Sequence, residues 1–155
     1  MNKTKIIGGL IGAAALAATA LIIPFEGKRT VTYLDPPGIP TICYGHTSGV
    51  KLGQIASDSD CVAFLESDIK IVDEALNRLI KVPVSDKYKA ALISFTFNVG
   101  QGNFAKSTLL KKLNAGDKVG ACNQIVRWVY VGKIKYEGLM RRRIQEKALC
   151  LEGIQ

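Results

Sequence analysis

Hydrophobic and polar residues follow three different patterns along the chain, and each predicts a different kind of element. The first is a continuous apolar run at residues 6–23, in which Leu and Ile are mixed with Gly, Ala and Thr. As a helix this run would extend about 27 Å, close to the thickness of a bilayer core. Lys3 and Lys5 precede it, so the N-terminus resembles an export signal or a membrane anchor.

The second pattern is an alternation of apolar and polar residues between positions 30 and 46. Val31 and Tyr33 come before the turn sequence Asp-Pro-Pro-Gly at residues 35–38, and Ile42 and Tyr44 come after it. Alternation on both sides of a Pro-Gly turn predicts a β-hairpin.

The third pattern has the period of a helix and covers the rest of the chain. Apolar residues spaced by three and four predict a helix of about six turns that follows Ser57. Ser85 is the expected N-cap of a second helix, apolar on all sides and therefore buried and central, which ends near residues 98–100. The class is α+β and mainly helical. Shorter helices are predicted at residues 108–113, 117–130 and 136–150.

Composition limits the number of domains. The chain has 155 residues, of which 48% are hydrophobic, so intrinsic disorder is excluded. Residues 1–25 form an N-terminal segment that contains the apolar run, and residues 26–155 suffice for one domain with one core. The net charge of +8 favours a polyanionic partner, for which nucleic acid, acidic lipid and cell-wall polymer all qualify.

The fate of the apolar segment has two interpretations. Ala18-Thr19-Ala20 fits the small-x-small pattern of a signal-peptide cleavage site. We favour an uncleaved anchor, because cleavage after Ala20 would leave an apolar tail at residues 21–25. Its eight Leu and Ile residues contribute roughly −4 kcal/mol of insertion free energy, so membrane residence would be marginal.

The four cysteines lie in the exported part of the chain, where an even number predicts disulfides. No two of the cysteines form a CxxC pair, and the chain has one histidine, so no metal site is expected. Three pairings are possible. We favour Cys122 with Cys150, which leaves Cys43 and Cys61 as a second bridge or as free thiols.

Candidate chemistry begins immediately after the apolar run, with Glu26, Asp35 and Thr41. Two carboxyl groups and a hydroxyl form an apparatus for acid-assisted hydrolysis by water. We expect Glu26 to keep its proton beside apolar Phe25 and Asp35 to be ionised in a polar turn. Taken singly, each residue also has a structural role, as a surface acid, a turn residue or a strand residue.

Three separated segments carry a family resemblance. They read FEGKRTVTYLDPPGIPTICYGHT, SFTFNVGQGNFAKSTLLKKLNAGD and CNQIVRWVYVG…GLMRRRIQE. They resemble phage-type lysozymes of glycoside hydrolase family 24, in particular lambdoid phage endolysins. The segment before them is similar to the signal-arrest-release sequences of some of these enzymes.

The resemblance implies a small hairpin lobe joined by a long helix to a helical lobe. It makes Glu26 the general acid, Asp35 the stabiliser of the oxocarbenium-like transition state, and Thr41 the residue that orients water. The expected enzyme is an endolysin that cuts the β-1,4 bond between N-acetylmuramic acid and N-acetylglucosamine in peptidoglycan. No cofactor and no nucleic-acid partner are implied, and a monomer is expected.

The resemblance also implies a location and a switch. Host export machinery would place the enzyme in the periplasm, tethered and inactive at the inner membrane through residues 6–25. After release, that segment would fold onto the domain as a helix. The alternative is a non-catalytic exported basic module that binds cell-wall polymer or nucleic acid.

Further residues are candidates for supporting roles. His46, Asn98, Gln101 and Asn103 are the candidate substrate-binding residues. For His46 we favour a supporting hydrogen bond to the hairpin, and the other three are turn residues by default. Cys43 stands where many relatives have Gly, so its redox state could bear on activity.

Two further sets of residues have a structural interpretation. The basic cluster Arg141, Arg142, Arg143, Lys133 and Lys135 is expected to be a solvated face, with a polyanion site as the alternative. Trp128 is expected in the core.

Overall fold

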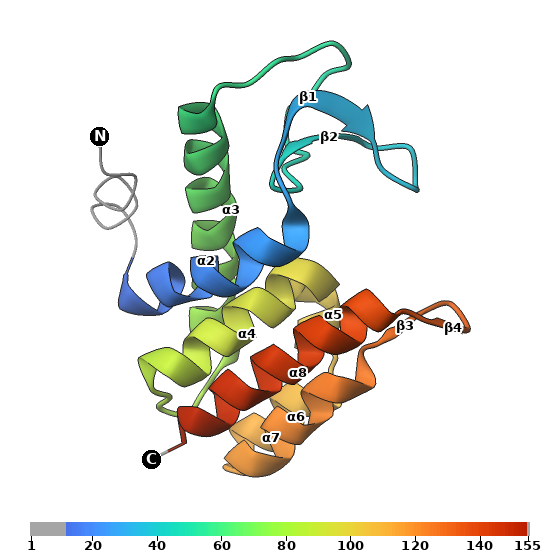
Figure 1. Cartoon of the computed structure of the whole chain (residues 1–155). Helices are drawn as coiled ribbons and strands as arrows, with labels where there is room; N and C mark the ends of the chain where they lie inside the picture. The colour runs from blue at the N-terminus through green and yellow to red at the C-terminus, as the bar shows by residue number, and fades with distance from the viewer. Residues whose placement is uncertain (1–11, 155) are drawn as a thin grey trace.

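The structure, a computed structural model, describes residues 12–154, and the predictions for residues 6–11 lie outside this range. It shows a small lobe and a helical lobe connected by the long helix α3 (Figure 1). The elements in chain order are α2 (Ala13–Glu26), β1 (Arg29–Leu34), β2 (Pro40–Cys43), α3 (Asp58–Leu79), α4 (Asp86–Val99), α5 (Gln101–Ala105), α6 (Thr108–Asn114), α7 (Lys118–Gln124), η1 (Ile125–Arg127), β3 (Tyr130–Val131), β4 (Ile134–Lys135) and α8 (Glu137–Glu152).

The small lobe is built on the predicted hairpin. Strands β1 and β2 are antiparallel, with Tyr33 opposite Thr41. A small separate core lies beneath them and reaches the first turn of α3; its buried members are Ile42, Cys43, Ala56 and Cys61. The hairpin is therefore anchored to α3 both by packing and by the Cys43–Cys61 disulfide.

Helices α3 and α4 begin directly after Ser57 and Ser85, as predicted, and both serines are N-caps. Ser57 accepts a hydrogen bond from the Asp60 N–H and Asp60 accepts one from the Ser57 N–H, which is a capping box. Ser85 caps α4, and Gly100, with a φ of +91°, ends it. Helix α4 is buried along most of its length, so the prediction of a central helix is confirmed.

The apolar segment that precedes the small lobe is packed against the protein. From Ala13 onward it forms α2, which packs chiefly on α4 and also contacts α8 and α3. In its described part the segment is folded onto the domain as a helix, which is the arrangement expected for it after release. Its buried face carries mostly small side chains, which let the helix axes approach closely; the buried residues are Ala14, Ala15, Ala18, Thr19 and Ile22.

The boundary expected after residue 25 falls inside α2, which ends at Glu26. Within residues 12–154, no helix combines the length and the apolar composition that crossing a membrane requires.

The prediction of a helix at residues 117–130 is wrong for its second half. Helix α7 ends at Gln124, a short 3-10 turn follows, and β3 and β4 then form a small hairpin. The β-branched and aromatic residues from Val126 to Val131 favour extended backbone over helix. Gly132, with a φ of +60°, starts the two-residue turn, where glycine is favoured.

The C-terminal helix α8 completes the helical lobe. The Cys122–Cys150 disulfide joins α7 to it, so the favoured pairing is confirmed. Of the two alternatives left open for Cys43 and Cys61, the structure shows the second bridge. Trp128 packs edge-to-face on Phe95, with ring centroids 5.6 Å apart, as expected for a core residue.

Candidate active site

Glu26 lies at the junction of the two lobes because it is the last residue of α2. One helical turn before it, Ile22 is fully buried, so the docked helix fixes the position of the carboxyl group. Gly27, with a φ of +65°, then turns the chain towards β1. The Glu26 side chain keeps 20% of its surface exposed, which leaves it accessible to a substrate.

The Glu26 carboxyl group contacts both lobes. From the helical lobe, Arg142 Nη1 donates a hydrogen bond to Glu26 Oε1 at 2.6 Å. From the small lobe, Gly45 approaches so closely that a Cβ atom there would lie 3.3 Å from Glu26 Oε2. The apolar surroundings expected for Glu26 are thus only part of its environment. Phe25 is adjacent in sequence, but the Arg142 guanidinium carbon lies over the Phe25 ring, 5.5 Å from its centroid.

Asp35 and Thr41 are held by one residue of the hairpin turn, Ile39. Asp35 Oδ1 accepts the Ile39 N–H at 2.7 Å, and the buried Thr41 hydroxyl donates to the Ile39 carbonyl at 2.9 Å. Asp35 is therefore a turn residue as well as a catalytic candidate. Because the Thr41 hydroxyl proton is engaged, its oxygen is free to act as an acceptor towards water.

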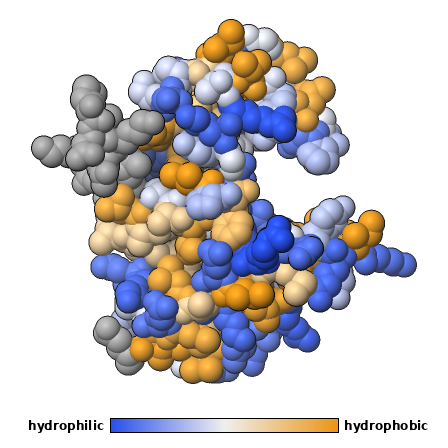
Figure 2. All heavy atoms as spheres, in the orientation of Figure 1, coloured by the Kyte–Doolittle hydropathy of each residue, from blue (hydrophilic) through white to orange (hydrophobic). Residues whose placement is uncertain are grey.

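A pocket of about 470 Å³ opens beside Glu26. It is formed by the end of α2, the end of α4, the β3–β4 hairpin and the start of α8, and its lining residues are Pro24, Phe25, Glu26, Asn98, Val131, Tyr136, Gly138, Leu139, Arg141 and Arg142. Figure 2 shows that the molecule is deeply hollowed between its two lobes. The pocket combines an apolar wall with charged groups, as ligand sites commonly do.

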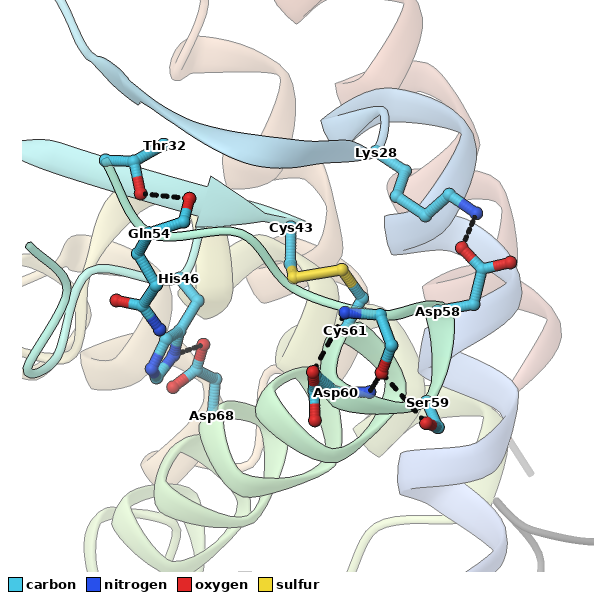
Figure 3. Close-up of a disulfide and its surroundings, with 11 residues drawn as sticks. Lys28, Thr32, Cys43, His46, Gln54, Asp58, Ser59, Asp60, Cys61 and Asp68 are labelled. Carbon is cyan, nitrogen blue, oxygen red and sulfur yellow. Dashed lines mark hydrogen bonds and ion pairs between the residues drawn. A yellow bond between two sulfur atoms is a disulfide. The ribbon is translucent and has the colours of Figure 1, made fainter. Parts of the chain in front are cut away.

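His46 supports the small lobe, although its side chain has a different partner from the one expected. Its Nδ1 lies 2.8 Å from Asp68 Oδ2 on α3, and its ring stacks on Phe64. Figure 3 shows the pair pointing towards each other below the hairpin. Burial raises the pKa of the Asp68 carboxyl, and His46 partly offsets this. The hairpin contact, with Ile42, is made by the His46 backbone.

The other candidate substrate residues separate into two groups. Asn98 lines the Glu26 pocket and accepts a hydrogen bond from Arg143 Nη2. Asn103 donates to the Val99 carbonyl at the α4–α5 junction, and Gln101 is exposed at the start of α5. The structure therefore brings Asn98, but neither Gln101 nor Asn103, into the lining of this pocket.

The solvated face expected for the basic cluster is wrong for two of its members. Arg142 and Arg143 are 3% and 1% exposed, and Glu146, which was not among the residues singled out from the sequence, is fully buried with them. The spacings of three and four residues between the arginines and Glu146 place all three on one helix face. That spacing was the available signal. Because both arginines are buried and paired with Glu146, they offer almost no surface to a polyanion.

Backbone geometry explains why glycine would suit the position that Cys43 occupies. Cys43 has a φ of +59° and is, among the described residues, the one non-glycine with positive φ. This conformation favours glycine, and here the disulfide to Cys61 and the small-lobe core surround the strained residue. The bridge lies two residues from Thr41, so it supports the hairpin where the candidate site is built.

No cluster of three or more His, Cys, Asp or Glu side chains suited to a metal ion is found in residues 12–154.

Comparisons with known proteins show which chains and folds this protein is similar to. The family model described as phage lysozyme matches residues 24–146. The SAR-endolysin of Enterobacteria phage PA-2 is 39% identical over 159 aligned positions, which cover 97% of this chain and 96% of the relative.

Two solved structures are similar in fold. The muramidase domain of SpmX from Asticaccaulis excentricus has a TM-score of 0.81 and 34% identity, covering 87% of this chain and 95% of that one. The active form of the P1 phage endolysin Lyz has a TM-score of 0.80 and 28% identity, covering 96% of this chain and 91% of that one.

Proposed function

Because the chain belongs to the phage lysozyme family and is a glycoside hydrolase of the lysozyme type, we propose that it cleaves the β-1,4 bond between N-acetylmuramic acid and N-acetylglucosamine. The substrate would be peptidoglycan, and cleavage of many such bonds would cause lysis of the host cell. The muramidase domain with the same fold supports this choice of bond.

The observation that carries the proposal is the placement of Glu26. It lies between Arg142 of the helical lobe and Gly45 of the small lobe, at the wall of a pocket. In our proposal Glu26 is the general acid that protonates the glycosidic oxygen. Because Oε1 accepts from Arg142, Oε2 is the oxygen that carries and delivers the proton.

Asp35 and Thr41 would act on the sugar and on water. The Asp35 carboxylate would stabilise positive charge on the anomeric carbon in the transition state. The Thr41 oxygen would accept a hydrogen bond from the attacking water, since its own proton is directed to Ile39. Their common attachment to Ile39 fixes the two side chains relative to each other, which is the preorganisation that such catalysis requires.

We further propose that residues 6–25 serve first as a weak membrane tether and later as part of the folded enzyme. The relative from phage PA-2 is a SAR-endolysin, which favours a tethered, periplasmic precursor. The described fold, with α2 docked, corresponds in this scheme to the released and active form. A helix inserted in the bilayer cannot also occupy its place on α4, so Glu26 would be misplaced until release.

The catalytic assignment is tested by the turbidity of purified peptidoglycan mixed with the full-length protein or with Glu26→Gln. We expect loss of turbidity with the first and a drop of at least about 100-fold in rate with the second, as loss of a general acid predicts. The matched control is Glu152→Gln, since Glu152 is exposed on α8 and its replacement should leave the rate unchanged. Circular dichroism would establish that each variant is folded.

Equal lysis by folded Glu26→Gln would transfer the acid role to another residue. An inactive parent protein that binds peptidoglycan would instead support the non-catalytic alternative.

A further inference from the structure

The β3–β4 hairpin lies at the edge of the Glu26 pocket and is exposed along both strands. Figure 1 shows it projecting from the helical lobe beside the start of α8. Its large apolar side chains are 46% to 63% exposed; they are Tyr130, Val131, Ile134 and Tyr136. A two-stranded hairpin gains little stability by itself in water, and exposed apolar groups bordered by charges are typical of binding surfaces.

The pairing of the two strands divides the side chains of the hairpin between two faces. Val131 lies opposite Ile134, and Tyr130 lies opposite Lys135. Tyr136 continues the extended backbone, with a φ of −107° and a ψ of 125°. Opposite side chains share a face and successive side chains alternate. One face therefore carries Val131, Ile134 and Tyr136, and the other carries Tyr130 and Lys135.

The pocket shows which of these faces is turned towards the candidate site. Val131 and Tyr136 line the pocket together with Glu26, whereas Tyr130 and Lys135 are not part of its lining. In Figure 2 the hairpin forms the lower edge of the hollow between the lobes, at the right of the view. A ligand bound at Glu26 would thus meet the first face and not the second.

Two cations border the face that meets the pocket. Lys133 is in the turn of the hairpin and is exposed, and Arg141 lines the pocket with its side chain 66% exposed. Within residues 12–154, Lys133 makes no ion pair, and Arg141 has a loose one with exposed Glu137, at 3.6 Å. Together with Lys135, they are the members of the basic cluster that reach solvent. Such cations attract anions with a strength that salt reduces.

Peptidoglycan offers anions at the place where these cations lie. Each N-acetylmuramic acid of the glycan carries a short peptide stem, and the stems contain free carboxylates. A bond cut next to N-acetylmuramic acid at Glu26 brings a stem to the edge of the pocket. The polyanion that the basic cluster predicted from the sequence is then the peptide part of the substrate itself.

We propose that the β3–β4 hairpin binds the peptide-bearing part of the substrate. Val131 and Tyr136 pack on its apolar surface, and Lys133 and Arg141 bind carboxylates of the stems. The inference rests on the proposed function, with peptidoglycan as the substrate. It gives the enzyme a preference for glycan with anionic stems over the same glycan without those charges, and the preference is expressed in KM.

The test compares kcat and KM of full-length variants on two substrates. One is purified peptidoglycan, and the other is the same material with its carboxylates converted to neutral methylamides. Replacing both Lys133 and Arg141 by Gln should raise KM about fivefold on the first substrate, as the loss of two exposed charge contacts predicts. On the second substrate the change should stay within about twofold, and kcat should be unaffected on both. About 0.5 M salt should remove most of the preference of the parent protein.

The second face of the hairpin supplies matched controls. Lys135→Gln removes the same charge as Lys133→Gln from the face that is turned away from the pocket, and it should leave KM within about twofold. Tyr136→Ala should raise KM about tenfold on both substrates, as expected when an aromatic anchor is lost. Tyr130→Ala is its control and should have no such effect. Circular dichroism would establish that each variant is folded.

Other results would overturn the proposal. Equal losses for Lys133→Gln and Lys135→Gln would show a general charge effect with no role for the pocket-facing side. A loss that persists on the methylamide substrate would exclude the stem carboxylates.

Cosedimentation with peptidoglycan gives a second measurement that does not depend on cleavage. In the Glu26→Gln background, replacing Lys133 and Arg141 by Gln should weaken retention about fivefold, and equal retention would overturn the role of the hairpin. Failure of the parent protein to cut either substrate would refute the proposed function, while cosedimentation would still decide whether the hairpin binds the stems.

Discussion

At the scale of single residues, three consecutive arginines have two different environments. Arg141 is largely exposed, and its Nη1 atom lies 3.6 Å from Glu137 Oε1. Arg142 and Arg143 are instead buried beside Glu146. Neighbouring helix positions point about 100° apart, so one run of basic residues can face both solvent and core. A basic cluster on a helix therefore cannot be assigned to solvent until its acidic partners at spacings of three and four have been considered.

Adding a single methyl group at Gly45 is expected to slow catalysis. Its φ is +78°, and a Cβ atom would lie 3.3 Å from Glu26 Oε2. Gly45→Ala should cost about 1 kcal/mol in unfolding free energy from backbone strain and lower kcat by about tenfold by crowding the acid.

Turnover on peptidoglycan and thermal unfolding would check the Gly45 prediction. Gly49→Ala is the control for strain alone, because φ there is +69° and an added Cβ atom would have no neighbour within 4 Å. Equal kcat for the two variants would contradict a role for space at Oε2.

Glu66 on α3 should make the stability of the protein depend on pH. It is 7% exposed, its Oε1 has no hydrogen-bond partner among residues 12–154, and burial raises its pKa. The folded state then binds the proton more tightly than the unfolded state, so unfolding free energy falls as pH rises from the unfolded pKa of about 4.3 through the folded pKa. Glu66→Met should remove this fall and raise unfolding free energy at pH 7 by about 1 kcal/mol.

Urea unfolding at pH 4 and at pH 7 would check the Glu66 prediction, with Glu74→Met as the control because Glu74 is exposed on the same helix. The gain from Glu66→Met should shrink at pH 4, where the carboxyl is protonated. The same gain at both pH values would show that packing, not charge, is responsible.

At the scale of elements, the proposed membrane tether places two demands on the sequence of helix α2. Its many Ala residues make insertion into a bilayer only weakly favourable, and the same small side chains fit the surface of α4. Larger apolar residues would favour the membrane and obstruct docking. The composition of α2 thus suits an element that leaves one environment for the other.

Adjacent alanines on α2 allow the two demands to be separated. In the folded protein Ala17 is exposed and Ala18 is fully buried. In a membrane-inserted helix, replacing either residue by Leu would add the same apolar surface. Both Ala17→Leu and Ala18→Leu should therefore delay lysis in cells. Only Ala18→Leu should also lower the specific activity of released enzyme, because overpacking a filled site costs about 1–3 kcal/mol.

The measurements are the time of lysis after induction and the turnover of released protein on purified peptidoglycan. Equal specific activity for the two variants would mean that close packing of α2 is not required for the active site. Unchanged timing in both would count against the membrane tether.

At the scale of the whole molecule, each lobe has its own disulfide. Cys43–Cys61 joins β2 to α3, and Cys122–Cys150 joins α7 to α8. Figure 3 shows the first bridge beneath the hairpin, beside the Ser59 and Asp60 turn that begins α3. The two bridges close loops of 18 and 28 residues, so each should contribute about 3 kcal/mol by restricting the unfolded chain.

The two bridges should differ in their effect on catalysis. Replacing Cys43 and Cys61 by Ser should lower both stability and turnover, because the hairpin that carries Asp35 and Thr41 loses its covalent link to α3. Replacing Cys122 and Cys150 by Ser should lower stability by a similar amount while folded protein retains its turnover. Chemical denaturation and assays below the unfolding transition would distinguish these results, and equal turnover in both variants would contradict the prediction.

The sequence alone determined the features that depend on neighbouring residues. The Ser85 cap, apolar periodicity and the Pro-Gly turn located the hairpin and helices α3 and α4, because these signals act within a few residues. The spacing of Glu26, Asp35 and Thr41 was visible for the same reason. The end of α7 was misjudged because extended and helical preferences compete over residues 126–131.

Only the tertiary structure decided which groups surround Glu26. Glu26 and Arg142 are 116 residues apart in sequence, and His46 finds Asp68 on another element. No local pattern encodes such pairs, since they arise when α2, α4 and α8 pack together and exclude water from charges that must then find partners. The sequence therefore determined the chemical groups available, and the packing of helices determined how they are paired and aimed.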